Sequence, residues 1–254
     1  MSRNHGFLIL YAHFSFLVLG NHIMMSDKLH RLVNSNLLDW VGVVIVLIGS
    51  LSLGYHRTWT TGGFPLGYVS IGTTVFSLLS TRFVSKQNNL GNVIGIFTAL
   101  LACIVDYMLG NTSAWLTFPV SMLANVAASV QWKKGVEVRT HDTLYYVLFA
   151  LSLLGGAGLT YLGFYRAGDT PNPALYVTTA LIVGFAFAGN IANVFKYQET
   201  WLTWMVYNGV KLYQSILLLN IANVFKYIYY IFNATITFID WHVNRAKPHN
   251  ARQQ

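Results

Sequence analysis

Apolar stretches alternate with short polar or Gly/Pro-containing connections along the whole chain. Nine can be read, at Phe7–Met24, Leu38–Gly54, Phe64–Leu79, Leu90–Leu109, Ser113–Val130, Thr143–Phe164, Ala174–Phe195, Trp201–Leu219 and Ile221–Ile239. A membrane-spanning helix needs about 17–25 residues, and most of the stretches have this length, although the third falls one residue short. The pattern therefore predicts an all-α integral membrane protein.

The composition supports this class. Of the 254 residues, 54% are hydrophobic and only 9% are charged, with a mean hydropathy of +0.48, whereas a soluble domain carries about 25% charged residues. The single cysteine, Cys103, excludes a disulfide framework or a cysteine metal site within one chain. The net charge of +8 reflects membrane topology better than nucleic-acid binding, because the basic residues concentrate in the connections.

The first stretch has two interpretations. Arg3 and His5 followed by FLILYAHFSFLVLG resemble a secretory signal peptide. The following residues, NHIMMSDK, contain no small-residue cleavage site, which favours a retained helix.

Lys and Arg side chains are distributed unevenly when alternate connections are assigned to opposite sides of the membrane. Eleven fall on one side, Arg82 among them, and five on the other, counting Lys211 and Lys226 within the last two stretches. We expect these two lysines to snorkel to the second side, and Asp106 to reach water at the outer end of its stretch. Because cytoplasmic loops are enriched in Lys and Arg, the N-terminus is predicted outside and the C-terminus in the cytoplasm.

The later stretches predict an internal repeat. The fifth stretch contains Asn125 and ends near Trp132, and the ninth contains Asn233 and ends near Trp241. The fifth and ninth stretches each end a group of three predicted helices, and one linker helix lies between the groups. Because a single linker helix crosses the membrane once, both groups enter the membrane in the same direction. Such a 3+1+3 layout of parallel repeats resembles SWEET-type transporters, whose sites lie near the bilayer midplane between the repeats.

The predicted divisions follow from this layout. They are residues 1–63 with one or two extra N-terminal helices, 64–136 with the first three-helix repeat, 137–169 with the linker helix, 170–242 with the second repeat, and 243–254 as a cytoplasmic tail.

The octapeptide NIANVFKY occurs twice, at residues 190–197 and 220–227. A fixed period usually indicates stacked repeats, but a stacked repeat keeps its orientation. Here the first copy ends the predicted seventh helix and the second begins the predicted ninth. Because the eighth helix crosses the membrane between them, the two copies lie on opposite sides of the membrane. We interpret the echo as a local duplication, and we have no physical account of its exact preservation.

Candidate binding residues cluster on the eighth stretch. Trp201, Trp204 and Asn208 have the spacing i, i+3, i+7, which places them on one face of a helix. Two indoles suit a flat or cationic ring, and a carboxamide suits hydroxyls or amides. Trp201 fits the interfacial aromatic belt as well as a site, since tryptophan is enriched there.

Further asparagines and one glutamine extend this candidate site. Asn125 and Asn233 occupy matching places in the two repeats, which favours a shared pocket over separate interhelical hydrogen bonds. Asn190 lies closer to the end of its helix, where capping or packing competes with binding, and Gln131 adjoins the basic KKG connection. Trp132 and Trp241 are predicted to be cytoplasmic belt residues.

Signatures of enzymes are missing from the chain. It contains no GxxxxGK[ST] loop, no HExxH and no GxSxG, and its eight histidines are scattered. The sequence therefore predicts neither an enzyme nor a bound cofactor or metal. A non-transporting membrane subunit remains a more distant alternative to a transporter.

Four segments resemble the PnuC-type vitamin transporters, best known for nicotinamide riboside. KYQETWLTWMVYN (196–208) is similar to the family pattern K-Y-x-E-x-W-x-x-W-x-x-x-N, and LANVAASVQW (123–132), NNLGNVIG (88–95) and YIYYIFNATITFIDW (227–241) match in the right order. The chain differs at Ala127, Ala128 and Ser129, where the family often has Tyr and Trp. It also opens the ninth helix with NIANVFKY in place of a Gly-x-Tyr-like sequence.

The resemblance, which runs from about Phe64 to Trp241, carries several implications. It implies facilitated diffusion of unphosphorylated nicotinamide riboside across a bacterial inner membrane, trapping of the product by a cytosolic kinase, and a homotrimer surrounded by lipid. Carried over by position, the substrate-binding residues would be Trp201, Trp204, Asn208, Asn125 and Asn233. Relatives carry other vitamins, so thiamine, or a sugar as in SWEET-type carriers, remains the alternative substrate.

Overall fold

The computed structural model describes residues 27–60, 62–168 and 170–244, and these ranges are helical and contain no strand. The helices are α2 (Asn36–Ser52), the short η1 (Tyr55–Arg57), α3 (Leu66–Ser85), α4 (Leu90–Met108), α5 (Ala114–Lys133), α6 (Thr143–Ala167), α7 (Pro173–Val194), α8 (Thr200–Leu217) and α9 (Ile221–Asn244). Helices α2 to α9 correspond to eight of the nine predicted stretches. The first, Phe7–Met24, and the tail after Asn244 lie outside the described residues.

Local signals in the sequence set the ends of α6. The Asp142 side chain accepts a hydrogen bond from the backbone N–H of Tyr145 at 2.9 Å, as an N-cap residue does. This bond and a second one from the Tyr197 hydroxyl lower the pKa of the Asp142 carboxyl. At the other end Gly168 takes the left-handed conformation, with φ 66°, and its N–H bonds back into the last turn.

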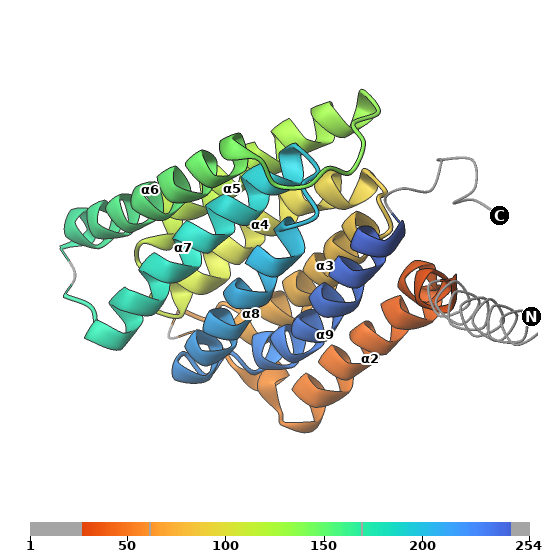
Figure 1. The fold of residues 1–254 in the computed structure, drawn as a ribbon. Coiled ribbons are helices and arrows are strands. Elements are labelled where there is room, and N and C mark those ends of the chain that lie inside the picture. The colour runs from red at the N-terminus through yellow and green to blue at the C-terminus, as the bar shows by residue number, and fades with distance from the viewer. Residues whose placement is uncertain (1–26, 61, 169, 245–254) are drawn as a thin grey trace, which may run out of the picture.

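Six helices form a closed ring. Going round it, α3 packs on α4, α4 on α5, α5 on α7, α7 on α8, α8 on α9, and α9 on α3 again. The other two helices lie outside the ring: α6 packs on α7 and α5, and α2 packs on α9 and α3 (Figure 1). The six ring helices are those assigned from sequence to the two three-helix groups. The symmetry relation between the groups stays a prediction.

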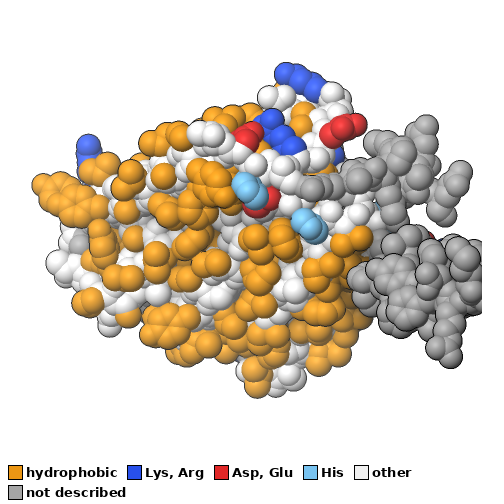
Figure 2. All heavy atoms as spheres, in the orientation of Figure 1, with side chains coloured by type: hydrophobic (Ala, Val, Ile, Leu, Met, Phe, Trp, Pro, Cys, Tyr) orange, Lys and Arg blue, Asp and Glu red, His pale blue; other side chains and the backbone are white. Residues whose placement is uncertain are grey.

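The outer surface suits a lipid environment. Large apolar side chains such as Phe97, Leu154 and Val177 are exposed, and Figure 2 shows apolar atoms over most of the visible face. By length and composition, three of the described helices are apolar enough to cross a membrane, α4, α6 and α7, and residues 27–34 with α2 form a fourth, bent candidate. The other ring helices are more polar because they turn polar faces inward.

Two helices extend further than the apolar pattern predicts. Helix α3 continues six residues past Leu79 to Ser85, and α9 continues past Ile239 to Asn244. The added turns contain buried polar residues: Arg82 is 1% exposed, and it donates to Asp39 Oδ1 at 2.7 Å and to Asn233 Oδ1 at 2.6 Å. Arg82 therefore ties α2, α3 and α9 together and is not the loop residue assumed in the charge count.

Small residues allow α6 to approach α7 closely. A Cβ added at Gly156 would lie 2.4 Å from the backbone nitrogen of Gly184, too close for any contact between real atoms. Close approach at small residues is the usual way in which membrane helices pack, because lipid gives no hydrophobic drive for helix association.

We expect Gly156→Ala to lower the thermal stability of the detergent-solubilised protein. The methyl group must push the α7 backbone away, and overpacking of this kind costs about 1–3 kcal/mol. Gly155→Ala is the matched control, because a Cβ at Gly155 meets no atom within 4 Å. Equal melting temperatures for the two variants would contradict the close contact between the helices.

Candidate functional site

The six-helix ring encloses a cavity of about 170 Å³. Every residue that lines it lies on α3, α4, α5, α7, α8 or α9, and none on α2 or α6. One water needs roughly 10–15 Å³ by this measure, so the cavity has room for on the order of ten waters. A small molecule fits a space of this size, and the lining determines which kind.

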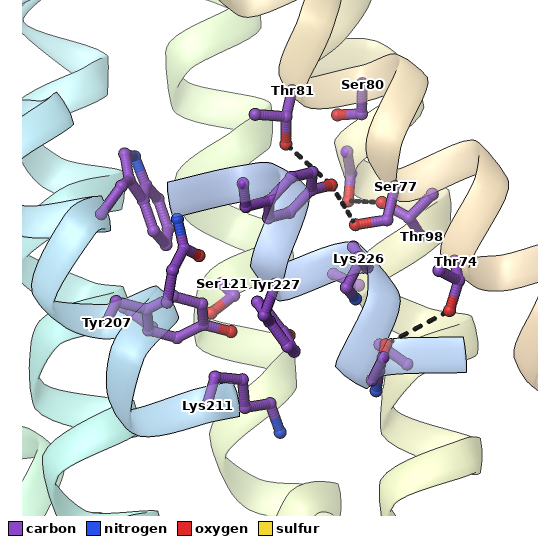
Figure 3. Close-up of a pocket in the computed structure, with 18 of the residues that line it drawn as sticks. Thr74, Ser77, Ser80, Thr81, Thr98, Ser121, Tyr207, Lys211, Lys226 and Tyr227 are labelled. Carbon is purple, nitrogen blue, oxygen red and sulfur yellow. Dashed lines mark hydrogen bonds between the residues drawn. The ribbon is translucent and has the colours of Figure 1, made fainter. Parts of the chain in front are cut away.

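Helix α3 contributes a stripe of hydroxyl groups. Its lining residues include Ser70, Thr73, Thr74, Ser77, Ser80 and Thr81, whose spacing keeps them on one helical face. Most of them bond within the protein: Thr74 donates to Asn223 at 3.2 Å, and Thr81 donates to the Tyr230 hydroxyl at 3.1 Å (Figure 3). The stripe thus connects α3 to α9 and makes this side of the cavity polar.

An aromatic wall runs across α8 and α9. The rings of Trp204 and Tyr207 meet edge to face with centroids 5.0 Å apart, Tyr207 meets Tyr227 at 6.0 Å, and Tyr227 meets Tyr230 at 5.9 Å. All four residues line the cavity. Interlocked rings of this kind hold one another in place, so the cavity offers fixed aromatic faces that adjoin the α3 hydroxyls at Tyr230.

Three tryptophans pack together at one end of the cavity. The Trp241 ring lies 6.4 Å from Trp132 and 5.5 Å from Trp201, and the three are 1–7% exposed. The prediction that Trp132 and Trp241 belong to an interfacial belt is therefore wrong, and so is that alternative for Trp201. Trp132 donates to Asn193 O at 2.8 Å and Trp241 to Ser85 O at 3.0 Å. These long-range partners fix the cluster.

Several buried polar atoms of cavity-lining residues lack a hydrogen-bond partner among the described residues. They are Thr73 Oγ1, Asn193 Oδ1, Trp201 Nε1 and Asn208 Oδ1. A buried donor or acceptor left unpaired costs about 1–3 kcal/mol. The set contains an N–H donor, two carbonyl acceptors and a hydroxyl, groups that can pair with hydroxyl and carboxamide groups.

The cavity also contains charged side chains. Lys211 donates to Asp106 Oδ2 at 2.5 Å, and both side chains are 4% exposed. Lys226 is 6% exposed and its ammonium lies 4.5 Å from the Tyr227 ring centroid. The expectations that both lysines snorkel and that Asp106 reaches water are therefore wrong. Charged groups inside a membrane bundle mark functional pathways, and these three were missed because each was explained separately.

The predicted site residues divide into two groups. Trp201, Trp204, Asn208, Asn125 and Asn190 all line the cavity. Asn233 and Gln131 do not line it: Asn233 is buried against Arg82, and Gln131 is half-buried near the end of α5. Whether any of the seven binds a substrate stays a prediction. Within the described residues no cluster of His, Cys, Asp and Glu has the arrangement of a metal site.

Both copies of the repeated octapeptide contribute to the cavity. The fourth residue of each copy, Asn193 on α7 and Asn223 on α9, is a lining residue. The seventh residues differ, since Lys226 lines the cavity whereas Lys196 lies over the Trp132 ring at 4.7 Å. The same octapeptide therefore places its asparagine at the cavity in both copies, but its lysine only in the second copy.

Comparison with known proteins agrees with this arrangement. The sequence model of the family described as nicotinamide mononucleotide transporter matches residues 67–243. No curated protein matches the chain. The solved crystal structure of the vitamin B3 transporter PnuC resembles it with a TM-score of 0.64 and 13% sequence identity, over 82% of this chain and 92% of that one. At this identity the likeness shows the fold alone.

The family match spans all six ring helices and begins after α2, so it includes every residue that lines the cavity. Helical architecture, apolar surface and family match agree on a multi-pass membrane transporter. The chain belongs to the nicotinamide mononucleotide transporter family.

Proposed function

We propose that this protein carries a pyridine riboside, nicotinamide riboside in the first place, across a bacterial inner membrane by facilitated diffusion. The observation that carries the proposal is the cavity inside the six-helix ring, which is lined by Trp201, Trp204, Asn208, Asn125 and Asn190. The family of the chain and the vitamin B3 transporter that shares its fold support the substrate class.

The proposed roles follow from side-chain chemistry. Trp204, on the aromatic wall, stacks on the pyridine ring, because an indole face attracts a cationic ring. The unpaired Trp201 Nε1 and Asn208 Oδ1 bond the carboxamide or the ribose, with Asn125 and Asn190 as further amide partners. Asn233 and Gln131 are left out of this set because they do not line the cavity.

The proposed transport cycle needs no energy source of its own. The two three-helix groups, α3–α5 and α7–α9, rock around the cavity so that it opens to one side at a time, with α6 as the linker. A cytosolic kinase that phosphorylates the product would keep uptake running downhill. The proposal includes a homotrimer with its N-terminus outside and its C-terminus in the cytoplasm.

Uptake into liposomes that contain only this protein tests the proposal. Labelled nicotinamide riboside should equilibrate across the bilayer, without an ion gradient, and should compete with its unlabelled form but not with glucose. Uptake of labelled thiamine without uptake of nicotinamide riboside would identify a thiamine carrier, and uptake of labelled glucose alone would identify a SWEET-like carrier. Absence of any uptake would favour a non-transporting subunit.

We expect Gly189→Ala to weaken nicotinamide riboside binding about tenfold. A Cβ at Gly189 would lie 2.9 Å from Trp204 Cε2, so the indole must move, and stacking on an aromatic side chain is worth roughly 1–3 kcal/mol. Titration followed by tryptophan fluorescence measures the affinity. Gly158→Ala is the control and should bind nicotinamide riboside normally, because a Cβ there meets no atom within 4 Å. If both variants bind with unchanged affinity, Trp204 does not contact the ligand.

A further inference from the structure

We propose that Trp132 and Trp241 form a reciprocal latch at one end of the cavity, and that this latch must break each time the cavity opens to the cytoplasm. The inference rests on the proposed function, because a latch has a role only if the cavity opens to each side in turn. It assigns gating residues to the proposed transport cycle, which the family match and the shared fold do not identify.

The two indole N–H groups make equivalent bonds between the two three-helix groups, α3–α5 and α7–α9. Trp132, near the end of α5, donates to the backbone oxygen of Asn193 on α7 at 2.8 Å. Trp241, near the end of α9, donates to the backbone oxygen of Ser85, the last residue of α3, at 3.0 Å. In both cases the third helix of one group is joined to the end of the first helix of the other. We call this pair of bonds the tryptophan latch.

The chemistry of the tryptophan latch suits a contact that has to form and break. A carbonyl in the last turn of a helix lacks the partner that a mid-helix carbonyl has, so it can accept a bond from another helix. An indole N–H carries no charge and only donates, and one neutral hydrogen bond changes an equilibrium by roughly two- to tenfold. Two such bonds favour the closed state at this end of the cavity without preventing it from opening.

The tryptophan latch lies directly behind the cavity. Trp201 lines the cavity, whereas Trp132 and Trp241 do not line it but belong to the same buried cluster as Trp201. The four helices that the latch joins all end on this side, which also carries the basic loop after α5. In the proposed topology this side faces the cytoplasm. Because the buried tryptophans occupy the space between the cavity and this side, opening here must separate the latch.

A different contact joins the two groups at the other end of the cavity. Lys211 lies ten residues after Trp201 on α8, about 15 Å along the helix, and it donates to Asp106 on α4. This ion pair does not involve the latch residues, so we expect it to stay in place when the latch is broken. Loss of the latch should therefore favour the state that is open to the cytoplasm. The shift should be partial, because the Asn193 side chain still bonds Asn92 on α4.

Thiol labelling of a cysteine inside the cavity measures how often the cavity is open to each side. Cys103 is the only cysteine of the chain, so Cys103→Ser removes the background. Ser121→Cys, at a residue that lines the cavity (Figure 3), adds the reporter. A membrane-impermeant methanethiosulfonate is applied to whole cells and to inverted membrane vesicles, which present opposite sides. A separate reporter, Lys134→Cys in the exposed α5–α6 loop, shows which preparation presents the latch side.

Trp132→Phe and Trp241→Phe each remove one indole N–H and keep an aromatic ring. Each should raise the labelling rate of the cavity cysteine from the latch side about two- to tenfold, and the rate from the other side should stay unchanged or fall. The double variant should show a larger rise than either single variant. Trp115→Phe is the matched control on α5, because Trp115 is 47% exposed and does not line the cavity, and it should label at the wild-type rate.

The side from which labelling rises decides between a latch and a purely structural contact. Unchanged labelling in both single variants, or an equal rise from both sides, would overturn the inference, because a general loosening of the bundle has no preferred side. Each bond is tested separately, so if one variant fails to reach the membrane, the other decides. The labelling needs no substrate. If wild type takes up no nicotinamide riboside, the proposed function fails, whereas a rise restricted to the latch side still supports the latch.

Discussion

Asp106→Asn is expected to destabilise the protein by about 3–5 kcal/mol, the usual cost of removing one partner from a buried ion pair. The substitution leaves the Lys211 ammonium, 4% exposed, without a counter-ion. Both side chains are almost fully buried, so solvent screens their interaction little. The loss should appear as a large fall in the thermal unfolding temperature of the detergent-solubilised protein.

The ion pair belongs to a chain of hydrogen bonds that connects three helices. Lys211 also donates to Gln214 Oε1 at 2.8 Å, and Gln214 donates to the Thr179 hydroxyl at 2.8 Å. The chain therefore runs from α4 through α8 to α7. Loss of the carboxylate removes its α4 end, so we expect the damage to spread to the packing of all three helices.

The double variant Asp106→Asn with Lys211→Met distinguishes charge from packing. Removing both charges eliminates the uncompensated buried ammonium, which is what makes the loss of one partner costly. We expect it to recover most of the stability lost in Asp106→Asn. If the single variant melts at the wild-type temperature, or the double variant melts lower than the single one, the two charges are not coupled as the geometry indicates.

The sequence predicted the helices well and the polar interior poorly, for one physical reason. A membrane helix is encoded by a local feature, an apolar run of sufficient length, and eight of the predicted runs are helical in the structure. A polar contact inside the bundle depends on a partner far away in the chain. Lys211 and Asp106 are 105 positions apart, and Arg82 and Asn233 are 151 apart. Considered alone, each of these side chains fits the surface or a helix end.

Some of the interior was nevertheless visible in the sequence. The α3 hydroxyls recur at spacings of three and four residues from Ser70 to Thr81, a polar stripe in an apolar stretch that predicts an inward-facing side. The i, i+3, i+7 face of α8 was identified in this way, and its three residues do line one cavity. Tryptophans at helix ends gave no such signal, because belt and buried cluster have the same sequence pattern.

Asn208→Leu is expected to weaken nicotinamide riboside binding about a hundredfold or more, because a site built to bond polar groups of its ligand loses its acceptor. The replacement has a similar size, and Asn208 is 3% exposed with its Oδ1 unpaired in the described structure. Removing an unpaired buried acceptor relieves an unfavourable burial. The variant should therefore unfold at the wild-type temperature or slightly above it.

This combination separates a binding role from a structural one. An asparagine that serves only to hold helices together would lose stability on substitution and would affect the ligand only through that loss. Fluorescence titration gives the affinity, and thermal unfolding of the same sample gives the stability. Val206→Leu, on the exposed face of the same helix at 50% exposure, should leave both unchanged. Normal affinity in Asn208→Leu would remove Asn208 from the site, whereas reduced stability with a proportionate loss of binding would assign it to the α8 packing instead.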